Sequence, residues 1–180
     1  VVDENPPAPP AEIQPTEVTP PPPAPTPPVE ETPPPAPPAP LVSVLATSPN
    51  FEEDGHVVAG TAEDGVFVST DRGLRWLPWN FGLLDLNVYA IAYSPIFASD
   101  QTIYIGTESG IFRSKNGGRA WRPLPFPMDA APVISLCFAP GDPADRRLLA
   151  GTEAHGLYAS DDDGATWSHI LPDLVSGAVN

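Results

Sequence analysis

Short hydrophobic runs recur along residues 42–178 at intervals of 45 and 46 positions. Each repeat begins with an apolar stretch, continues after a polar loop with a second run that ends in Gly-Thr, and then has a glycine followed by an apolar pair. The opening stretches are Val42–Thr47, Val88–Tyr93 and Val133–Phe138. Short runs rich in β-branched and aromatic residues, separated by Gly, Asp and Asn, are typical of β-strands. No segment has a sustained helical period, so we expect an all-β fold.

Each repeat then contains the pattern Ser-x-Asp/Asn-x-Gly-x-x-Trp, which we call the turn motif. Ser, Asp and Asn side chains bond to nearby backbone groups and stabilise tight turns. Gly adopts backbone conformations that residues with a Cβ avoid, and Trp contributes a large apolar surface to a core. We therefore predict a structural role for these residues. They are Ser69, Asp71, Gly73 and Trp76, then Ser114, Asn116, Gly118 and Trp121, and then Ser160, Asp162, Gly164 and Trp167.

The turn motif resembles the Asp-box, or BNR repeat, of sialidase-like β-propellers. The resemblance covers residues 42–178 and implies that each motif is a hairpin turn between the third and fourth strands of a blade, far from any catalytic centre. Four strands in about 45 residues is the size of one propeller blade. We expect a partial β-propeller of three four-stranded antiparallel blades at 42–87, 88–132 and 133–178, with the first strand of each blade nearest the axis.

The spacing also makes a prediction about the ends of the chain. Each motif Trp is followed 12 positions later by the Val that opens the next repeat, and the same step from Trp167 reaches Val179. We therefore expect the propeller segment 42–180 to include the start of a fourth blade at 179. Because propellers usually close with four to eight blades, we expect a piece of a longer propeller. Self-association into a closed ring is the alternative. The first residue, Val1, is not an initiator Met, which suggests that further sequence precedes it.

Residues 1–41 differ from the repeats in composition. The first 40 residues hold 18 of the 28 prolines and six acidic residues, with no Lys, Arg, Gly or aromatic residue. Such a segment buries too little apolar surface to offset its chain entropy. We predict a disordered linker with polyproline II character, which acts as a stalk. Its PxxP spacings leave a ligand for a proline-binding domain as the alternative.

The formal net charge of the chain is −15. Nucleic acids and anionic membranes bind basic surfaces, so neither is an expected partner. No apolar run is long enough to insert into a membrane. The resemblance to photosystem-assembly propellers implies a basic patch, which we do not expect in so acidic a chain. The single cysteine excludes an internal disulfide, and its alignment with Ala46 and Ala92 predicts that Cys137 is a small buried thiol.

Families with Asp-boxes include sialidases, xyloglucan-cleaving glycosidases, sortilin-like receptors and photosystem-assembly propellers. The Arg-Ile-Pro motif that the resemblance implies for a sialidase is absent, and four arginines lie in or beside the turn motifs, opposite the active site of that family. Glycosidases use two carboxylates about 5 to 9.5 Å apart, and no spacing singles out such a pair. We therefore predict no catalytic residue and no cofactor. The arginines are Arg72, Arg75, Arg119 and Arg122, and the candidate carboxylates are Asp100, Glu108 and Asp142.

Three smaller features have a structural interpretation that we favour over a functional one. The Asp161–Asp163 run has the oxygen ligands that calcium prefers, but we expect it to face solvent and predict no metal site. The histidines His56, His155 and His169 do not form a spaced zinc set, and we expect surface or turn roles. The aromatic group Trp76, Trp79 and Phe81 is either a binding patch or packing between blades, and we favour packing.

Together these observations favour a non-catalytic β-propeller scaffold for protein or carbohydrate interaction. We expect it to be displayed on its Pro-rich stalk outside the cytoplasm, as a secreted, periplasmic or cell-surface protein. The alternative is a fragment of a glycoside hydrolase, sialidase-like or xyloglucanase-like, whose catalytic residues lie partly outside this chain.

Overall fold

The computed structural model describes residues 39–127, 129, 131–141 and 146–171, which all belong to one compact unit that begins at Pro38. The predictions for the Pro-rich residues 1–38 and for a further blade at Val179 lie outside the described residues.

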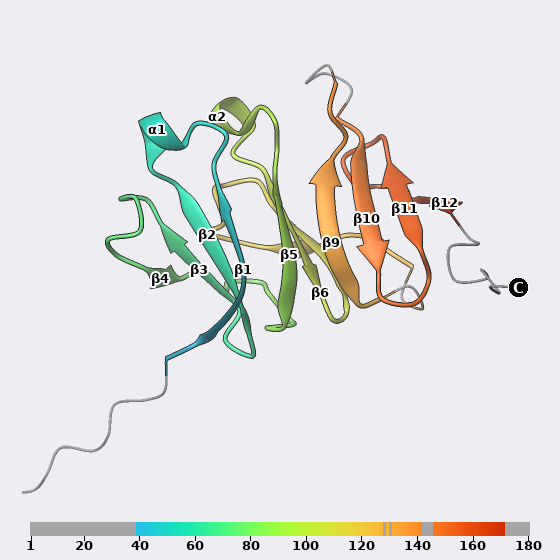
Figure 1. Ribbon diagram of the computed structural model, residues 1–180, viewed down its shortest axis with the longest axis horizontal. Coiled ribbons are helices and arrows are strands. Elements are labelled where there is room, and N and C mark those ends of the chain that lie inside the picture. The colour runs from blue at the N-terminus through green and yellow to red at the C-terminus, as the bar shows by residue number, and fades with distance from the viewer. Residues whose placement is uncertain (1–38, 128, 130, 142–145, 172–180) are drawn as a thin grey trace, which may run out of the picture. The chain divides into compact units, whose positions relative to one another are not determined.

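The described residues form three four-stranded antiparallel sheets, and within each sheet the strands lie in chain order (Figure 1). This confirms the all-β prediction. The first sheet contains β1 (Leu41–Thr47), β2 (Val57–Ala62), β3 (Val66–Ser69) and β4 (Leu77–Pro78). The second contains β5 (Val88–Tyr93), β6 (Ile103–Thr107), β7 (Gly110–Ser114) and β8 (Arg122–Pro123). The third contains β9 (Val133–Phe138), β10 (Leu148–Thr152), β11 (Leu157–Ser160) and β12 (Ser168–Leu171).

The first strands of the three sheets, β1, β5 and β9, follow one another across the molecule (Figure 1) and contact each other in turn. They therefore occupy equivalent places in a stack of similar sheets, which is the arrangement expected of successive propeller blades.

Two one-turn helices lie in the loops between the first and second strands of the first two sheets. α1 (Phe51–Asp54) lies between β1 and β2, and α2 (Phe97–Asp100) lies between β5 and β6. Each follows a buried serine whose hydroxyl donates to an aspartate six residues later, over 2.6 Å from Ser48 to Asp54 and 2.8 Å from Ser94 to Asp100. A single turn leaves no helical period in the sequence, so these helices were not predicted. Among the described residues, no helix is long and apolar enough to cross a membrane.

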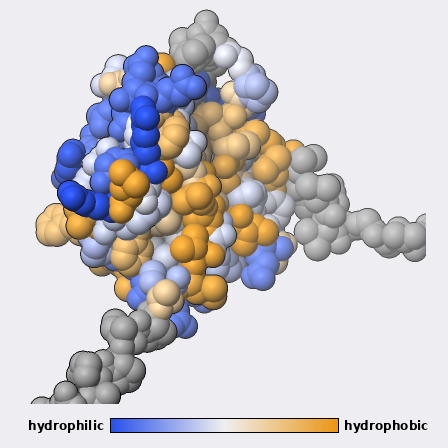
Figure 2. All heavy atoms as spheres, turned by 60° about the vertical axis from the view of Figure 1, so that its left-hand side comes forward, coloured by the Kyte–Doolittle hydropathy of each residue, from blue (hydrophilic) through white to orange (hydrophobic). Residues whose placement is uncertain are grey.

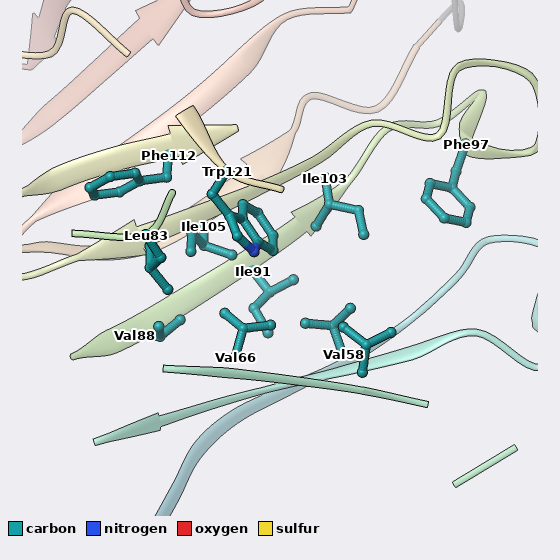
Figure 3. Packing of buried hydrophobic residues seen from close by; sticks show 11 residues of the cluster. Val58, Val66, Leu83, Val88, Ile91, Phe97, Ile103, Ile105, Phe112 and Trp121 are labelled. Carbon is teal, nitrogen blue, oxygen red and sulfur yellow. The ribbon is translucent and has the colours of Figure 1, made fainter. Parts of the chain in front are cut away.

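Each sheet has an upstream face, turned toward the preceding repeat, and a downstream face, turned toward the following repeat. The first core lies between the downstream face of the first sheet and the upstream face of the second (Figure 3). Val58 and Val66 from the first sheet pack with Ile91 and Ile105 from the second, and Trp121 lies among them, 2% exposed. Burial of these side chains joins the two sheets, since each apolar side chain removed from water contributes about 1.5–3 kcal/mol.

The second core repeats this arrangement one sheet further along the chain. Ala92 and Tyr104, on the downstream face of the second sheet, pack with Leu148, Ala150 and partly exposed Leu136 on the upstream face of the third. The same face-to-face packing thus occurs twice between consecutive sheets.

Candidate functional site

The three turn motifs adopt one geometry and lie between the third and fourth strands of their sheets. In each motif, the serine hydroxyl accepts a hydrogen bond from the glycine amide, at 2.8, 2.9 and 2.8 Å in chain order. The same hydroxyl donates to the Asp or Asn side chain, at 2.9, 2.9 and 2.8 Å. The same carboxylate or amide oxygen accepts from the backbone amide four residues later, in Arg75, Ala120 and Thr166. The motif glycines have φ of 87°, 91° and 82°, which favours glycine over residues with a Cβ.

These hydrogen bonds stabilise the charged form of the two motif aspartates. The backbone amide of Arg75 lowers the pKa of Asp71. The hydroxyl of Thr166, followed by its backbone amide, lowers the pKa of Asp162 to about 2. Asn116 makes the equivalent bonds without a charge, so the turn needs an oxygen acceptor rather than a carboxylate.

The motif tryptophans have different surroundings, although the sequence assigns all three to a core. Trp121 is buried and its indole nitrogen donates to the carbonyl of Trp79 over 2.8 Å. Trp167 packs edge-on against Phe126, with the ring centroids 5.1 Å apart. Trp76 is 38% exposed, because it belongs to the first sheet and no preceding sheet covers it among the described residues.

Two predictions about single residues are wrong. His56 is buried rather than superficial. Its Nδ1 lies 2.8 Å from the hydroxyl of Tyr93 and its Nε2 lies 3.0 Å from the carbonyl of Gly117. Burial lowers the pKa of His56 below its usual value of 6.5. Cys137, by contrast, is exposed. It lies on the downstream face of the third sheet, which no described sheet covers. The other histidines, His155 and His169, are exposed as expected.

Within the described part of the chain, the candidate carboxylates do not form an open catalytic pair. Asp100 and Asp163 share one guanidinium, with Arg146 Nη2 3.0 Å from Asp100 and 3.1 Å from Asp163. Asp100 also accepts from the Ser94 hydroxyl and from the amide of Thr102. Two carboxylates close together would suit a glycosidase, but here both are held by an ion pair with the same arginine.

The remaining acidic candidates are also locally engaged or lie outside the described residues. Glu108 accepts from the side-chain amide of Asn87 over 3.0 Å, and Asp142 is not among the described residues. Asp161 pairs with Arg147 at 3.7 Å. No group of three or more His, Cys, Asp or Glu side chains converges in the described part of the chain to hold a metal.

A groove of about 530 Å³ lies beside the second turn motif, along the hairpin of β7 and β8. Three basic side chains line it together with an exposed aromatic ring: Phe81 is 80% exposed, Lys115 and Arg122 are exposed, and Arg113 is half-buried. Arg113 is fixed by donating to the carbonyl of Asp163 over 2.8 Å. The lining residues are Phe81, Arg113, Lys115, Asn116, Ala120, Trp121 and Arg122.

The predicted aromatic group divides between packing and exposure. Trp79 packs on the first core and lies under the guanidinium of Arg119, whose Cζ is 5.1 Å from its ring centroid. The ring of Phe81 instead borders the groove, so its exposure favours the binding interpretation at this one position.

The expectation that the chain has no basic patch is therefore wrong locally. Four of its eight basic residues fall within residues 113–122, and no acidic residue occurs between Glu108 and Asp129. The net charge of the whole chain hides this local excess. A count of charge in a short window along the sequence would have identified it.

Comparison with solved structures supports the propeller architecture. A structure described as an ancestral GH74 enzyme matches at 23% identity and TM-score 0.60, covering 71% of this chain and 18% of its own. The GH74 xyloglucanase from Xanthomonas campestris matches at 25% identity and TM-score 0.55. The match covers 72% of this chain and 20% of the xyloglucanase. YCF48 from Cyanidioschyzon merolae matches at 14% identity and TM-score 0.59. The match covers 81% of this chain and 46% of YCF48. No family model and no curated protein matches the chain.

The chain spans about a fifth of the length of the two GH74 structures and less than half of YCF48. The three sheets are thus similar to part of a β-propeller, and the fold is an all-β partial propeller.

Proposed function

We propose that this chain is a non-catalytic β-propeller scaffold that binds an acidic segment of a partner protein in the groove beside the second turn motif. The predicted setting is a Pro-rich stalk outside the cytoplasm. The observation that carries the proposal is the concentration of exposed basic side chains around Phe81 in a chain whose net charge is −15.

The chemistry of the groove fits a peptide with carboxylates. Arg122 and Lys115 supply cationic hydrogen-bond donors to carboxylates, and neither has an acidic partner within 4.0 Å among the described residues. The exposed ring of Phe81 offers an apolar surface for the body of the peptide. Arg113, already held by the carbonyl of Asp163, adds positive charge in a fixed position.

The arrangement of the acidic residues supports a role without catalysis. Glycoside hydrolysis needs one carboxyl group as an acid and a second as a base or nucleophile. Asp100 and Asp163, which approach one another around Arg146, are both held by that arginine. Asp100 also accepts hydrogen bonds from the Ser94 hydroxyl and the Thr102 amide, so its oxygens contact groups of the chain itself.

The alternative function is a fragment of a xyloglucan-cleaving hydrolase. It is favoured by the 25% identity with the GH74 xyloglucanase from Xanthomonas campestris. On that alternative, this chain contributes sheets to a larger enzyme, and the groove has no role in recognition.

Fluorescence anisotropy with a labelled decapeptide of alternating Glu and Gly tests the binding proposal. We expect the full chain to bind this peptide and not its Gln-Gly counterpart, with affinity that falls as salt increases. Arg122→Glu should weaken binding at least tenfold. Arg75→Glu is a matched control, since Arg75 is an exposed arginine of the first turn motif with the same change in charge. Equal effects of the two substitutions, or equal binding of the two peptides, would exclude the groove as the site.

A further inference from the structure

Two arginines lie directly opposite one another on the last two strands of the second sheet. The register of β7 and β8 pairs Arg113 with Arg122, and residues paired in this way project from the same face of a sheet. Both arginines line the basic groove beside the second turn motif. Like charges directly opposite one another destabilise a sheet, so the pairing costs stability unless an anion lies between the two side chains.

The blade fold itself does not require charged residues at these two places. The same places, just before the motif serine and just after the motif tryptophan, are also paired in the other two sheets. They hold Val68 and Leu77 in the first sheet, and Ala159 and Ser168 in the third. The two positive charges are therefore a feature of the second sheet rather than of the repeat.

The described carboxylates do not compensate these charges. Arg113 and Arg122 have no acidic partner within 4.0 Å among the described residues. Arg113 donates from Nη1 to the carbonyl of Asp163 over 2.8 Å, which orients the guanidinium without neutralising it. Its remaining N–H groups and the whole guanidinium of exposed Arg122 are available to an anion in the groove.

The aromatic border of the groove is held beside this pair by the backbone. The amide of Trp121 donates to the carbonyl of Phe81 over 2.8 Å. Gly82 has a φ of 80°, and a Cβ at this residue would overlap the carbonyl oxygen of Trp121. The chain at Phe81 therefore lies directly against the start of β8, and its largely exposed ring borders the groove from there.

Charge distinguishes this groove from two others in the described structure. An apolar groove of about 600 Å³ lies on the first sheet, on the side of the molecule where Figure 2 shows hydrophobic residues gathered. A smaller groove is bordered by Glu52 and Glu53. Of the three grooves, only the one beside the second turn motif offers cationic partners to an anion.

We propose that Arg113 and Arg122 together bind one doubly charged phosphate monoester, carried by the partner protein as a phosphorylated side chain. This inference rests on the proposed function and names the acidic group that the groove prefers. A phosphoryl group has a charge of about −1.5 to −2 at pH 7 and three acceptor oxygens, so one group can accept from both guanidinium groups and neutralise both. A carboxylate has a single charge, and its two oxygens match one guanidinium.

Fluorescence anisotropy on the full chain tests the inference with three labelled decapeptides that are otherwise composed of glycine. Their centre is a phosphoserine, two adjacent glutamates or an unmodified serine. The first two peptides have nearly the same charge, so they differ in whether that charge lies on one group or on two. We expect the phosphoserine peptide to bind about tenfold more tightly than the diglutamate peptide, and the serine peptide not to bind.

Substitutions copied from the first sheet separate the arginine pair from positive charge in general. Arg122→Leu introduces the residue found at Leu77, and Arg113→Val introduces the residue found at Val68. Each should abolish the preference for phosphoserine over diglutamate. Arg122 is exposed, so its variant keeps the fold and tests the inference even where Arg113→Val is less stable. Arg75→Leu, at an exposed arginine outside the groove, is the matched control and should keep the preference.

The pH dependence of binding gives a second readout. The second pKa of a phosphate monoester is about 6, whereas the pKa of a glutamate side chain is about 4.3. The preference for phosphoserine should therefore fall between pH 7.5 and pH 5.5, because only the phosphate loses charge. Unchanged binding of the diglutamate peptide over this range shows that the groove is intact.

The outcomes separate this inference from the proposed function. Equal affinity for the phosphoserine and diglutamate peptides, with both dependent on Arg122, would overturn the inference and leave the proposed function standing. A preference for phosphoserine that survives in Arg122→Leu would also overturn it. Absence of binding by both charged peptides would overturn the inference and the proposed function together.

Discussion

The imidazole of His56 joins the first and second sheets through a hydrogen bond with Tyr93, with 2.8 Å between Nδ1 and the hydroxyl oxygen. His56 lies just before β2, and Tyr93 ends β5. Because the carbonyl of Gly117 only accepts, Nε2 of His56 donates to it, and Nδ1 of the neutral ring then accepts from the Tyr93 hydroxyl. The neutral imidazole is therefore the form that fits this position.

This arrangement predicts a loss of stability in mild acid. The pKa of His56 is lowered by burial in the folded protein, so the unfolded chain binds a proton first as the pH falls. The contribution of neutral His56 to stability is complete above pH 6.5 and is lost progressively below it. We expect the melting temperature to fall between pH 7 and pH 5. Asp54 and Arg119, the charged groups that act on His56, do not reverse this direction.

The variant His56→Gln tests whether protonation of His56 causes this loss. Its melting temperature should depend less on pH between pH 7 and pH 5 than that of the unsubstituted chain. His169→Gln is the matched control, because His169 is exposed and its replacement should preserve the pH dependence of the original chain. The same slope in His56→Gln as in the unsubstituted chain would show that other groups cause the loss.

The second prediction concerns the turn motif aspartate of the third sheet in strong acid. The pKa of Asp162 is lowered to about 2 by hydrogen bonds from Thr166 and Ser160. Its contribution to stability is therefore present above about pH 4 and is lost as the pH falls toward 2. Asp162→Asn should remove this part of the acid dependence, because Asn116 forms the same turn without a charge. Acid unfolding followed by circular dichroism, with Asp161→Asn as the control, measures the difference.

The third prediction tests the serine of the turn motif. Ser114 is fully buried, and its hydroxyl bonds to Gly118 and Asn116. By analogy with lost side-chain caps, Ser114→Ala should lower the free energy of unfolding by about 0.5–2 kcal/mol. Ser109→Ala should have a smaller effect, because Ser109 is exposed. Chemical denaturation gives both values, and equal small effects would contradict a structural role for the motif.

The fourth prediction separates two tryptophans that look equivalent in the sequence. Trp121 lies in the first core at 2% exposure, so Trp121→Ala should cost about 3–5 kcal/mol. Trp76 is 38% exposed on the upstream face of the first sheet, which no described sheet covers. Trp76→Ala should therefore cost clearly less when unfolding is measured at a protein concentration where the chain is monomeric. Equal losses would mean that the upstream face of the first sheet is covered within a single copy.

The strands were predictable because their residue pattern is local. Alternation and β-branched runs identify β5 over Val88–Tyr93 without knowledge of any other segment. The surroundings of individual side chains depend on distant parts of the chain and were not predictable in this way. His56 is buried where it contacts Gly117, 61 residues away, and Cys137 is exposed on a face that no described sheet covers. The groove combines Phe81 with a basic hairpin that begins 29 residues later.

Hydrolysis assays test most directly the central claim that this propeller segment acts without catalysing glycoside hydrolysis. The full chain, incubated with xyloglucan and separately with a sialoside, should release no reducing sugar and no sialic acid above a protein-free control. This result is expected because Asp100 and Asp163 are both held by Arg146. Turnover of either substrate that is lost in Asp100→Asn and retained in Asp161→Asn would contradict the account and identify the chain as a glycosidase.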